Sequence, residues 1–257
     1  MKTYITLQRG TNHKTFCEDF LVAQPFGQDY FVGAVADGCS SGKDSHFAST
    51  LICKLLRKQV LLHKLTNQTD PEQYAINLLK ALTYQLREVQ ETLDISQLEM
   101  LATLILLIYH RPAHKVVAVV LGDGVLCLNG QLIDIDHDNR PDYLAYHLDD
   151  TDQQLEEYLQ SQVFVENNPK DIAIATDGIL SFHSLQPHSK AEFSSEFFAE
   201  YLLKDTTFQQ FDNMLNRKCN LLHSQLKVSP YDDLAAIRLF VGEIPQAQAW
   251  HEAILSL

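Results

Sequence analysis

The sequence predicts an α+β fold, because helical and strand-like segments occur in separate blocks rather than in alternation. Two helical segments precede a block of strand-like segments at residues 100–135, and two more precede a closing strand at 234–241. A βαβ protein would place a helix between successive strands. Within the strand block the turns are short, which indicates an antiparallel meander; they lie at Arg111-Pro112, Gly122-Asp123 and Asn129-Gly130.

The first third of the chain is predicted to hold three strands and two helices. Apolar residues favour strands at 4–8, 20–24 and 31–37, the last being FVGAVAD, which is followed by a flexible Gly-Cys-Ser-Ser-Gly turn. Apolar residues at helical spacing then predict helices at about 45–63 and 71–93. Asp70 followed by Pro71 is typical of a helix start.

The remainder of the chain continues this order. The meander strands are expected at 100–109, 114–121, 124–128 and 131–135. Residues 136–168 are polar, with a short helix expected near 152–160, and they are a candidate flap over a functional site. The later elements are a strand at 171–176, helices near 192–203 and 206–226, the strand at 234–241, and a helix in the tail 242–257. With no clear boundary, residues 1–257 are predicted to form one domain.

Composition excludes several classes of partner and site. The 257 residues include 20 Lys and Arg against 33 Asp and Glu, a net charge of −13, so nucleic acid and anionic membranes are not expected partners. The longest apolar run, residues 101–109, is too short to cross a bilayer, and the N-terminus lacks the apolar region of a secretory signal. Five scattered cysteines without a CxxC pair favour a reducing cytoplasm.

Five short acidic motifs are spaced along the chain, and three of them end apolar, strand-like runs: FVGAVADG, KVVAVVLGDG and DIAIATDG. A single Asp-Gly pair is more often a turn than a ligand. Several carboxylates held at strand ends can converge on an oxygen-lined pocket, which suits a hard cation such as Mg²⁺ or Mn²⁺. The motifs are Glu18-Asp19, Asp37-Gly38, Gly122-Asp123, Asp177-Gly178 and Asp232-Asp233.

Other catalytic motifs fail on spacing. Gly38 and Gly42 have three residues between them, whereas the glycines of a Walker A phosphate loop have four. No cysteine has an arginine six residues later, as a cysteine phosphatase requires, and G-x-S-x-G is absent. The acidic motifs therefore carry the chemical interpretation.

In order and context, these motifs resemble those of the metal-dependent protein phosphatases of the PPM or PP2C type. The family's Glu-Asp, Val-x-Asp-Gly, Gly-Asp hairpin, Ser/Thr-Asp-Gly and late Asp-Asn motifs match Glu18-Asp19, Val35-Ala36-Asp37-Gly38, Gly122-Asp123, Thr176-Asp177-Gly178 and Asp232-Asp233. The stretch GTNHKTFCEDF further resembles a bacterial branch. The resemblance spans about residues 7–241. It implies a four-layer α-β-β-α sandwich of two antiparallel sheets flanked by helices.

The resemblance also implies roles for individual residues. Asp37 would bridge two cations, Mg²⁺ or Mn²⁺, and the carbonyl of Gly38 would bind one of them. Asp177 and Asp232 would bind the other. The remaining acidic residues would support the site, through metal-bound water or at a weaker third cation: Glu18, Asp19 and Asp123. Asp233, where the family has Asn, is either a further ligand or a hydrogen-bonding turn residue.

By the same resemblance, the reaction is hydrolysis of phosphoserine or phosphothreonine in a protein. The cations would clamp the phosphate and lower the pKa of a bridging water, whose hydroxide attacks phosphorus. Asp37, Asp177 and Asp232 would carry catalysis, with Lys14 binding the phosphate. The expected partner is a phosphorylated protein substrate, and the protein would oppose a serine/threonine kinase.

Two departures from the family pattern keep other functions open. Lys14 stands where the family has a phosphate-binding Arg, and it cannot form arginine's bidentate fork, so Arg9 or His13 are alternatives for that role. Cys39 stands where some members place a histidine proton donor. The alternatives are a pseudophosphatase that acts as a regulatory binding module, and a hydrolase of small phosphoesters. Retention of the acidic motifs weighs against the pseudophosphatase.

Overall fold

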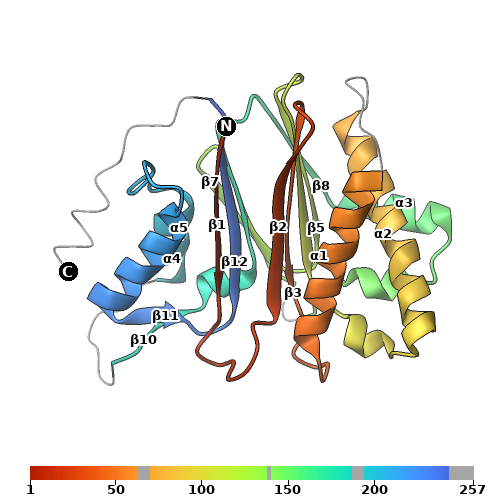
Figure 1. The fold of residues 1–257 in the computed structure, drawn as a ribbon, viewed down its shortest axis with the longest axis horizontal. Coiled ribbons are helices and arrows are strands. Elements are labelled where there is room, and N and C mark those ends of the chain that lie inside the picture. Colours follow the sequence, from red (N-terminus) through yellow and green to blue (C-terminus); the bar gives the residue numbers. More distant parts are fainter. Residues whose placement is uncertain (63–69, 138–139, 187–193, 243–257) are drawn as a thin grey trace.

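The computed structural model of the protein has four layers in the order helices, sheet, sheet, helices (Figure 1). It describes residues 1–62, 70–137, 140–186 and 194–242. The mixed α and β composition and the two antiparallel sheets confirm the predicted fold class. No helix in the described part of the chain combines the length and the apolar character that a membrane span requires.

The first sheet has five antiparallel strands in the order β1-β12-β9-β6-β7. Its strands are β1 Lys2–Gln8, β12 Leu234–Phe240, β9 Asp171–Ala175, β6 Gly124–Leu128 and β7 Gln131–Ile135. Two helices cover its outer face, α4 Ser195–Leu203 and α5 Met214–Leu221. The predicted start of α4, residues 192–193, lies outside the described residues.

The second sheet also has five antiparallel strands, in the order β2-β3-β4-β5-β8. Its strands are β2 Asp19–Phe26, β3 Tyr30–Asp37, β4 Leu104–His110, β5 Lys115–Leu121 and β8 Val163–Asn167. The helices on its outer side are α1 Ser45–Leu62, α2 Pro71–Leu93 and α3 Asp152–Ser161. Asp70 caps α2, as predicted: its side chain accepts the Gln73 N–H.

Three apolar cores hold the four layers together. Between the sheets, alternate strand residues such as Phe31, Leu107 and Ile237 are almost fully buried. The opposite faces of the same strands pack against helices. Leu56 and Leu82 of α1 and α2 belong to the second core. The third core, under α4 and α5, contains residues such as Phe198, Met214 and Phe240. Burial of both faces of each sheet explains why β3 and β4 are almost entirely apolar and why β12 is apolar apart from Arg238.

Polar groups are also buried beneath the first sheet. Arg238 of β12 pairs with Asp171 at 2.7 Å, and Lys218 of α5 lies 3.1 Å from the carboxylate of Asp205. The side chains of Arg238, Lys218 and Asp205 are fully buried. Lys218 Nζ also donates to the backbone carbonyls of Tyr201 and Asp205, which completes three hydrogen bonds around one ammonium group. Such pairs fix the helices in place as long as both members are present.

The predicted meander is wrong in its pairing. β4 pairs with β5 and β6 pairs with β7, but β5 and β6 lie in different sheets. The chain crosses between the sheets at Gly122-Asp123, where Gly122 and Gly124 both have positive φ. Glycine adopts these angles without the strain of a side chain. The local turn signal was correct, but packing sends the two strands to separate layers.

The predicted helix at 206–226 is interrupted. Asp205 Oδ1 accepts the Thr207 N–H, and Phe208 has a φ of +69°, so residues 206–213 form turns before α5 begins at Met214. A π-helical turn, Leu222–Leu226, then ends the segment. The hydrogen bond from the Thr207 N–H to the Asp205 side chain competes with helix formation.

Three strands were missed: one lies in the segment 136–168, which was read as polar, and the other two have only three residues each. They are β8 and a two-stranded ribbon, β10 Phe182–Ser184 and β11 Val228–Pro230. The helix near 152–160 is confirmed as α3. The strand predicted at 100–109 begins only at Leu104, after a 3₁₀ turn at Gln97–Met100. The helix predicted in the tail lies outside the described residues, apart from Gly242.

Candidate active site

A polar pocket of about 210 Å³ opens at the edge of the sandwich, where strands from both sheets end. The loop between β1 and β2 lies at the same edge, seen below the sheets in Figure 1. Residues far apart in the chain therefore meet here. Of the residues predicted for the site, six line the pocket: Glu18, Asp37, Gly38, Asp123, Asp177 and Asp232.

The glycines of the two Asp-Gly motifs lie where no side chain fits. A Cβ on Gly38 would lie 2.0 Å from the carbonyl oxygen of Ser45, and a Cβ on Gly178 would lie 1.7 Å from that of Asp233. Neither glycine has a positive φ, so the requirement is close backbone approach rather than an unusual turn. These contacts bring the preceding aspartates, Asp37 and Asp177, to the pocket.

Asp19 and Asp37 are paired residues on neighbouring strands, so their carboxyl groups lie side by side on one face of the sheet. Asp19 is buried, and its Oδ2 accepts the Thr176 hydroxyl at 2.6 Å. Burial raises the pKa of Asp19 to about 7. Burial, followed by the charges of Asp19 and Asp177, raises the pKa of Asp37 well above its usual range. Two carboxylates this close cannot both be ionised without a compensating cation or proton.

Asp177, Asp232 and Asp123 also line the pocket. Enclosure in the pocket, followed by the charges of Asp232 and Asp123, raises the pKa of Asp177 to about 6. Asp123 is partly engaged: its Oδ1 accepts the backbone N–H of His137 and lies 2.7 Å from Nδ1 of the same residue. The Asp232 side chain is 44% exposed and is open to a ligand.

Asp233 anchors the loop between β1 and β2. Its side chain has no exposed surface. Oδ1 accepts the Gly10 N–H at 2.6 Å, and Oδ2 accepts the N–H of Glu18 and lies 2.7 Å from Nδ1 of His13. Since an ionised carboxylate only accepts, His13 Nδ1 carries the hydrogen. Both oxygens of Asp233 are thus occupied by donors of the protein, and the residue does not line the pocket.

His13 is the basic side chain that this anchor holds against the pocket. Its Nε2 lies 3.7 Å from both Glu18 Oε2 and Asp232 Oδ1. Burial lowers the pKa of His13, but the hydrogen bond to Asp233 and the nearby carboxylate charges outweigh it, and the net shift is upward. Lys14 is exposed and, like Arg9, is absent from the pocket lining. Of the three residues considered for phosphate binding, His13 is the one that lines the pocket.

The pocket also contains residues that the sequence did not single out. Asn12 and Ser40 come from loops next to predicted motifs. Pro141 and Tyr143 come from the polar segment that was a candidate flap. Proximity to a motif could have indicated the first two. No sequence pattern marked the other two, because a long connection packs wherever the fold allows.

The donor atoms of the pocket fit a hard divalent cation in kind, since they are carboxylate oxygens. Asp19 Oδ1, buried beneath the pocket, receives no donor from the described residues. Burial and neighbouring carboxylate charges raise the pKa values of Asp37 and Asp177, and a bound cation would offset that repulsion. Among the described residues, however, no three His, Cys, Asp or Glu side chains are arranged as a complete metal-binding group. The pocket residues therefore supply oxygen donors that suit a divalent cation, and they leave part of its coordination shell unfilled.

Comparison with known protein families identifies the family of this chain. The profile of the protein phosphatase 2C family matches residues 9–217, which include most of the acidic motifs. The chain therefore belongs to the protein phosphatase 2C family. No curated protein matches the sequence significantly.

Solved structures share the fold at low sequence identity. The serine/threonine phosphatase Stp1 from Staphylococcus aureus is 14% identical, with a TM-score of 0.62 over 94% of this chain and 95% of that chain. A bacterial serine phosphatase is also 14% identical, with a TM-score of 0.56 over 95% of this chain and 99% of that chain. RsbX in complex with magnesium is 16% identical, with a TM-score of 0.51 over 92% of each chain. At this identity the likeness shows the fold alone.

Proposed function

We propose that the protein is a phosphatase dependent on Mg²⁺ or Mn²⁺ that hydrolyses phosphoserine or phosphothreonine in a protein substrate. The observation that carries this proposal is the convergence of six predicted residues from separate parts of the chain on one pocket. Family membership makes phosphate ester hydrolysis the reaction to test first. The structure of RsbX with magnesium supports Mg²⁺ as a candidate cation.

Each pocket residue has a proposed task. Asp37, Asp177 and Asp232, with the carbonyl of Gly38, would hold two cations. Glu18, Asp19 and Asp123 would support them, the last at a weaker third cation. Bound divalent cations neutralise phosphate charge and lower the pKa of water, which provides a nucleophile at neutral pH.

The chain's own residues orient the site. Asp233 is proposed to act as an anchor that fixes the backbone of Glu18 and the ring of His13. His13 then presents Nε2 to the side of the pocket where a phosphate oxygen would lie. The phosphate-binding role of Lys14 stays a prediction. From the exposed rim of the pocket, its ammonium group would attract phosphate as a point charge.

The alternative is a catalytically weak or inactive pseudophosphatase that serves as a binding module. It is favoured by the lack of an arginine among the described residues that line the pocket. Small phosphoesters are the alternative substrates. We place the protein in the cytoplasm, since all five cysteines are free and a reducing compartment preserves them. There it would act on a phosphorylated protein, against a serine/threonine kinase.

Turnover of p-nitrophenyl phosphate tests the proposal directly. Activity is expected with Mn²⁺ or Mg²⁺ and none in EDTA, and Asp37→Asn should lower kcat/KM at least about a hundredfold. Asp212→Asn is the matched control, because that side chain is 99% exposed. Absence of wild-type activity with either metal from pH 6 to 9 would leave the pseudophosphatase as the better description.

A panel of phosphopeptides then separates the substrate classes. Hydrolysis of phosphoserine and phosphothreonine peptides supports a protein substrate, whereas turnover of small phosphoesters alone supports the other alternative. The variants Lys14→Ala and His13→Ala test which residue binds phosphate. Removal of the residue that contacts phosphate should raise KM, and removal of the other should leave KM unchanged.

A further inference from the structure

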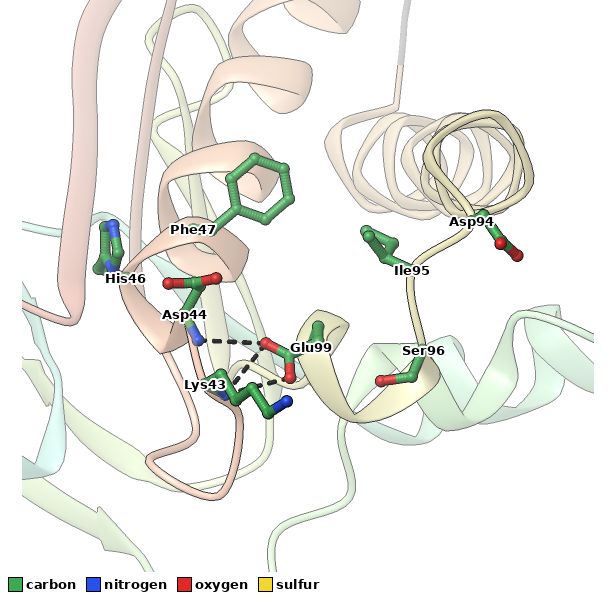
Figure 2. A pocket seen from close by; sticks show the side chains of 8 residues that line it. All are labelled: Lys43, Asp44, His46, Phe47, Asp94, Ile95, Ser96 and Glu99. Carbon is green, nitrogen blue, oxygen red and sulfur yellow. Dashed lines mark hydrogen bonds between the residues drawn. The ribbon is translucent and has the colours of Figure 1, made fainter.

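A second cavity, of about 520 Å³, lies between the start of α1 and the turn that follows α2 (Figure 2). Phe47 of α1 and Ile95 of the turn face each other across it. Both side chains are only half-buried. The cavity therefore has two apolar walls that are accessible to a ligand.

The charge of this cavity is negative. Its lining includes three carboxylates, from Asp44, Asp94 and Glu99, against the single ammonium of Lys43. Glu99 is already used: it accepts the backbone N–H groups of Lys43 and Asp44, and these bonds lower its pKa. Among the described residues, neither Asp44 nor Asp94 has an ion pair or a side-chain hydrogen bond. Two carboxylates are thus left without a partner in the described part of the chain.

A single four-residue turn of the backbone separates the cavity from the candidate active site. Cys39 lines the active-site pocket, and its carbonyl accepts the Gly42 N–H at 3.0 Å, which closes a four-residue turn. Lys43, the next residue, lines the cavity. Because the ends of such a turn are within about 7 Å, Cys39 and Lys43 are at most about 11 Å apart. An extended peptide spans that distance in about three or four residues.

An aromatic pair connects the two pockets at the surface. Phe16 of the β1–β2 loop stacks on His46 of α1, with ring centroids 4.2 Å apart. Phe16 is 55% exposed although it is a large apolar side chain. His46 lines the cavity, and the loop that carries Phe16 also carries His13 of the active site. The surface between the pockets can therefore support an extended chain.

We propose that this cavity is a substrate subsite that binds an arginine or lysine side chain of the phosphopeptide, three to four residues from the phosphorylated residue. This inference rests on the proposed protein phosphatase function. The methylene stem of the basic residue would lie between Phe47 and Ile95, with its charged end toward Asp44. Long basic side chains combine an apolar stem with a charged end in this way.

Charge complementarity favours a basic side chain over other occupants. An acidic side chain would face the unpaired carboxylate of Asp44, and an aliphatic one would leave it without a partner. Arginine also stacks on aromatic rings, and Phe47 offers such a ring. The net charge of −13 further favours a basic peptide in the encounter.

Phosphoserine peptides that carry one arginine at successive positions on either side of the phosphoserine test the subsite. The arginine should raise kcat/KM about five- to tenfold at three or four positions from the phosphoserine, relative to glutamate at the same position. The preference should weaken as salt is added. The double variant Asp44→Asn/Asp94→Asn should remove the preference while turnover of p-nitrophenyl phosphate stays unchanged.

The variants and controls keep the outcome clear. Both aspartates are exposed, and asparagine suits the left-handed backbone of Asp94 (φ +52°), so the double variant should fold normally. Glu88→Gln removes a charge from the exposed side of α2, outside the cavity, and should keep the preference. Equal kcat/KM values across the peptide series, or an arginine preference that survives in the double variant, would overturn the proposed subsite.

A binding measurement separates this inference from the proposed function. Fluorescence anisotropy of the labelled peptides in EDTA reports affinity without turnover. If the protein hydrolyses no phosphoester but binds the arginine peptide more tightly, and the double variant loses that difference, the subsite stands and the catalytic proposal falls. If hydrolysis is normal and the two affinities are equal, the catalytic proposal stands and the subsite falls.

Discussion

Replacing Asp233 by asparagine distinguishes a loop anchor from a metal ligand. In the structure, Oδ2 of Asp233 receives the Glu18 N–H and the His13 Nδ1–H, while Oδ1 receives the Gly10 N–H. Asparagine keeps one oxygen, which can still accept from Gly10. Its amide N–H₂ group would then face the Glu18 N–H, so the bond from Glu18 is lost, whereas His13 can keep its bond by carrying its hydrogen on Nε2 and accepting at Nδ1.

The magnitude follows from burial. A hydrogen bond to a charged acceptor contributes about 1.5–3 kcal/mol, and an unsatisfied donor adds to its loss. Solvent cannot replace the bond, because the Asp233 side chain has no exposed surface. We expect a loss of about 2–4 kcal/mol in the free energy of unfolding. For a chain of 257 residues this corresponds to a fall in Tm of roughly 5–10 °C.

Thermal unfolding in EDTA and in Mn²⁺ distinguishes the two roles. An anchor lowers Tm by the same amount in both conditions, whereas a metal ligand lowers it only when Mn²⁺ is present. Asp212→Asn, with an almost fully exposed side chain, should match the wild type in both. A Tm for Asp233→Asn within about 2 °C of the wild type in EDTA would refute the anchor role.

Three further outcomes are expected. Lys218→Ala should lower the free energy of unfolding by about 3–5 kcal/mol in urea titrations, because it leaves the buried Asp205 carboxylate without its ammonium. Gly178→Ala should lower the yield of folded protein, measured by near-UV circular dichroism, since its Cβ would lie 1.7 Å from a carbonyl oxygen. In EDTA, Tm should fall as the pH rises from about 4 to about 7, because the pKa values of Asp19 (about 7) and Asp177 (about 6) are raised above the unfolded value of 3.8 and the folded state therefore holds protons that the unfolded chain releases.

The sequence predicted the strands that carry the site because both faces of these strands are buried. β3 and β9 are continuous apolar runs, and each stops at an aspartate next to a glycine. That local pattern was sufficient to place Asp37 and Asp177 at strand ends. It did not show which sheet a strand joins. At Gly122 the same turn signal could close a hairpin or cross between sheets, and the surroundings of the turn, which include Thr103 and Pro141, lie outside the local pattern.

The residue proposed to face phosphate shows why the rest of the candidate site could not be predicted. His13 and Lys14 are neighbours in the loop, and either could have faced the pocket. The choice is made by Asp233, 220 residues further along the chain, which holds the His13 ring. Such a long-range contact leaves no local signal. Similarly, Tyr143 reaches the pocket from a polar segment without periodicity.

The position of the candidate site links its geometry to the stability of the sandwich. Asp19 and Asp37 belong to the second sheet, whereas Thr176 and Asp233 belong to segments that flank strands of the first. The Thr176 hydroxyl donates to Asp19, and Asp233 accepts from the loop that leads into β2, so these polar bonds join the two sheets at the edge of their apolar core. Any movement of one sheet relative to the other would separate the two groups of carboxylates. The rigid core between the sheets therefore sets the spacing of the candidate ligands, and a cation bound across them would in turn hold the sheets together.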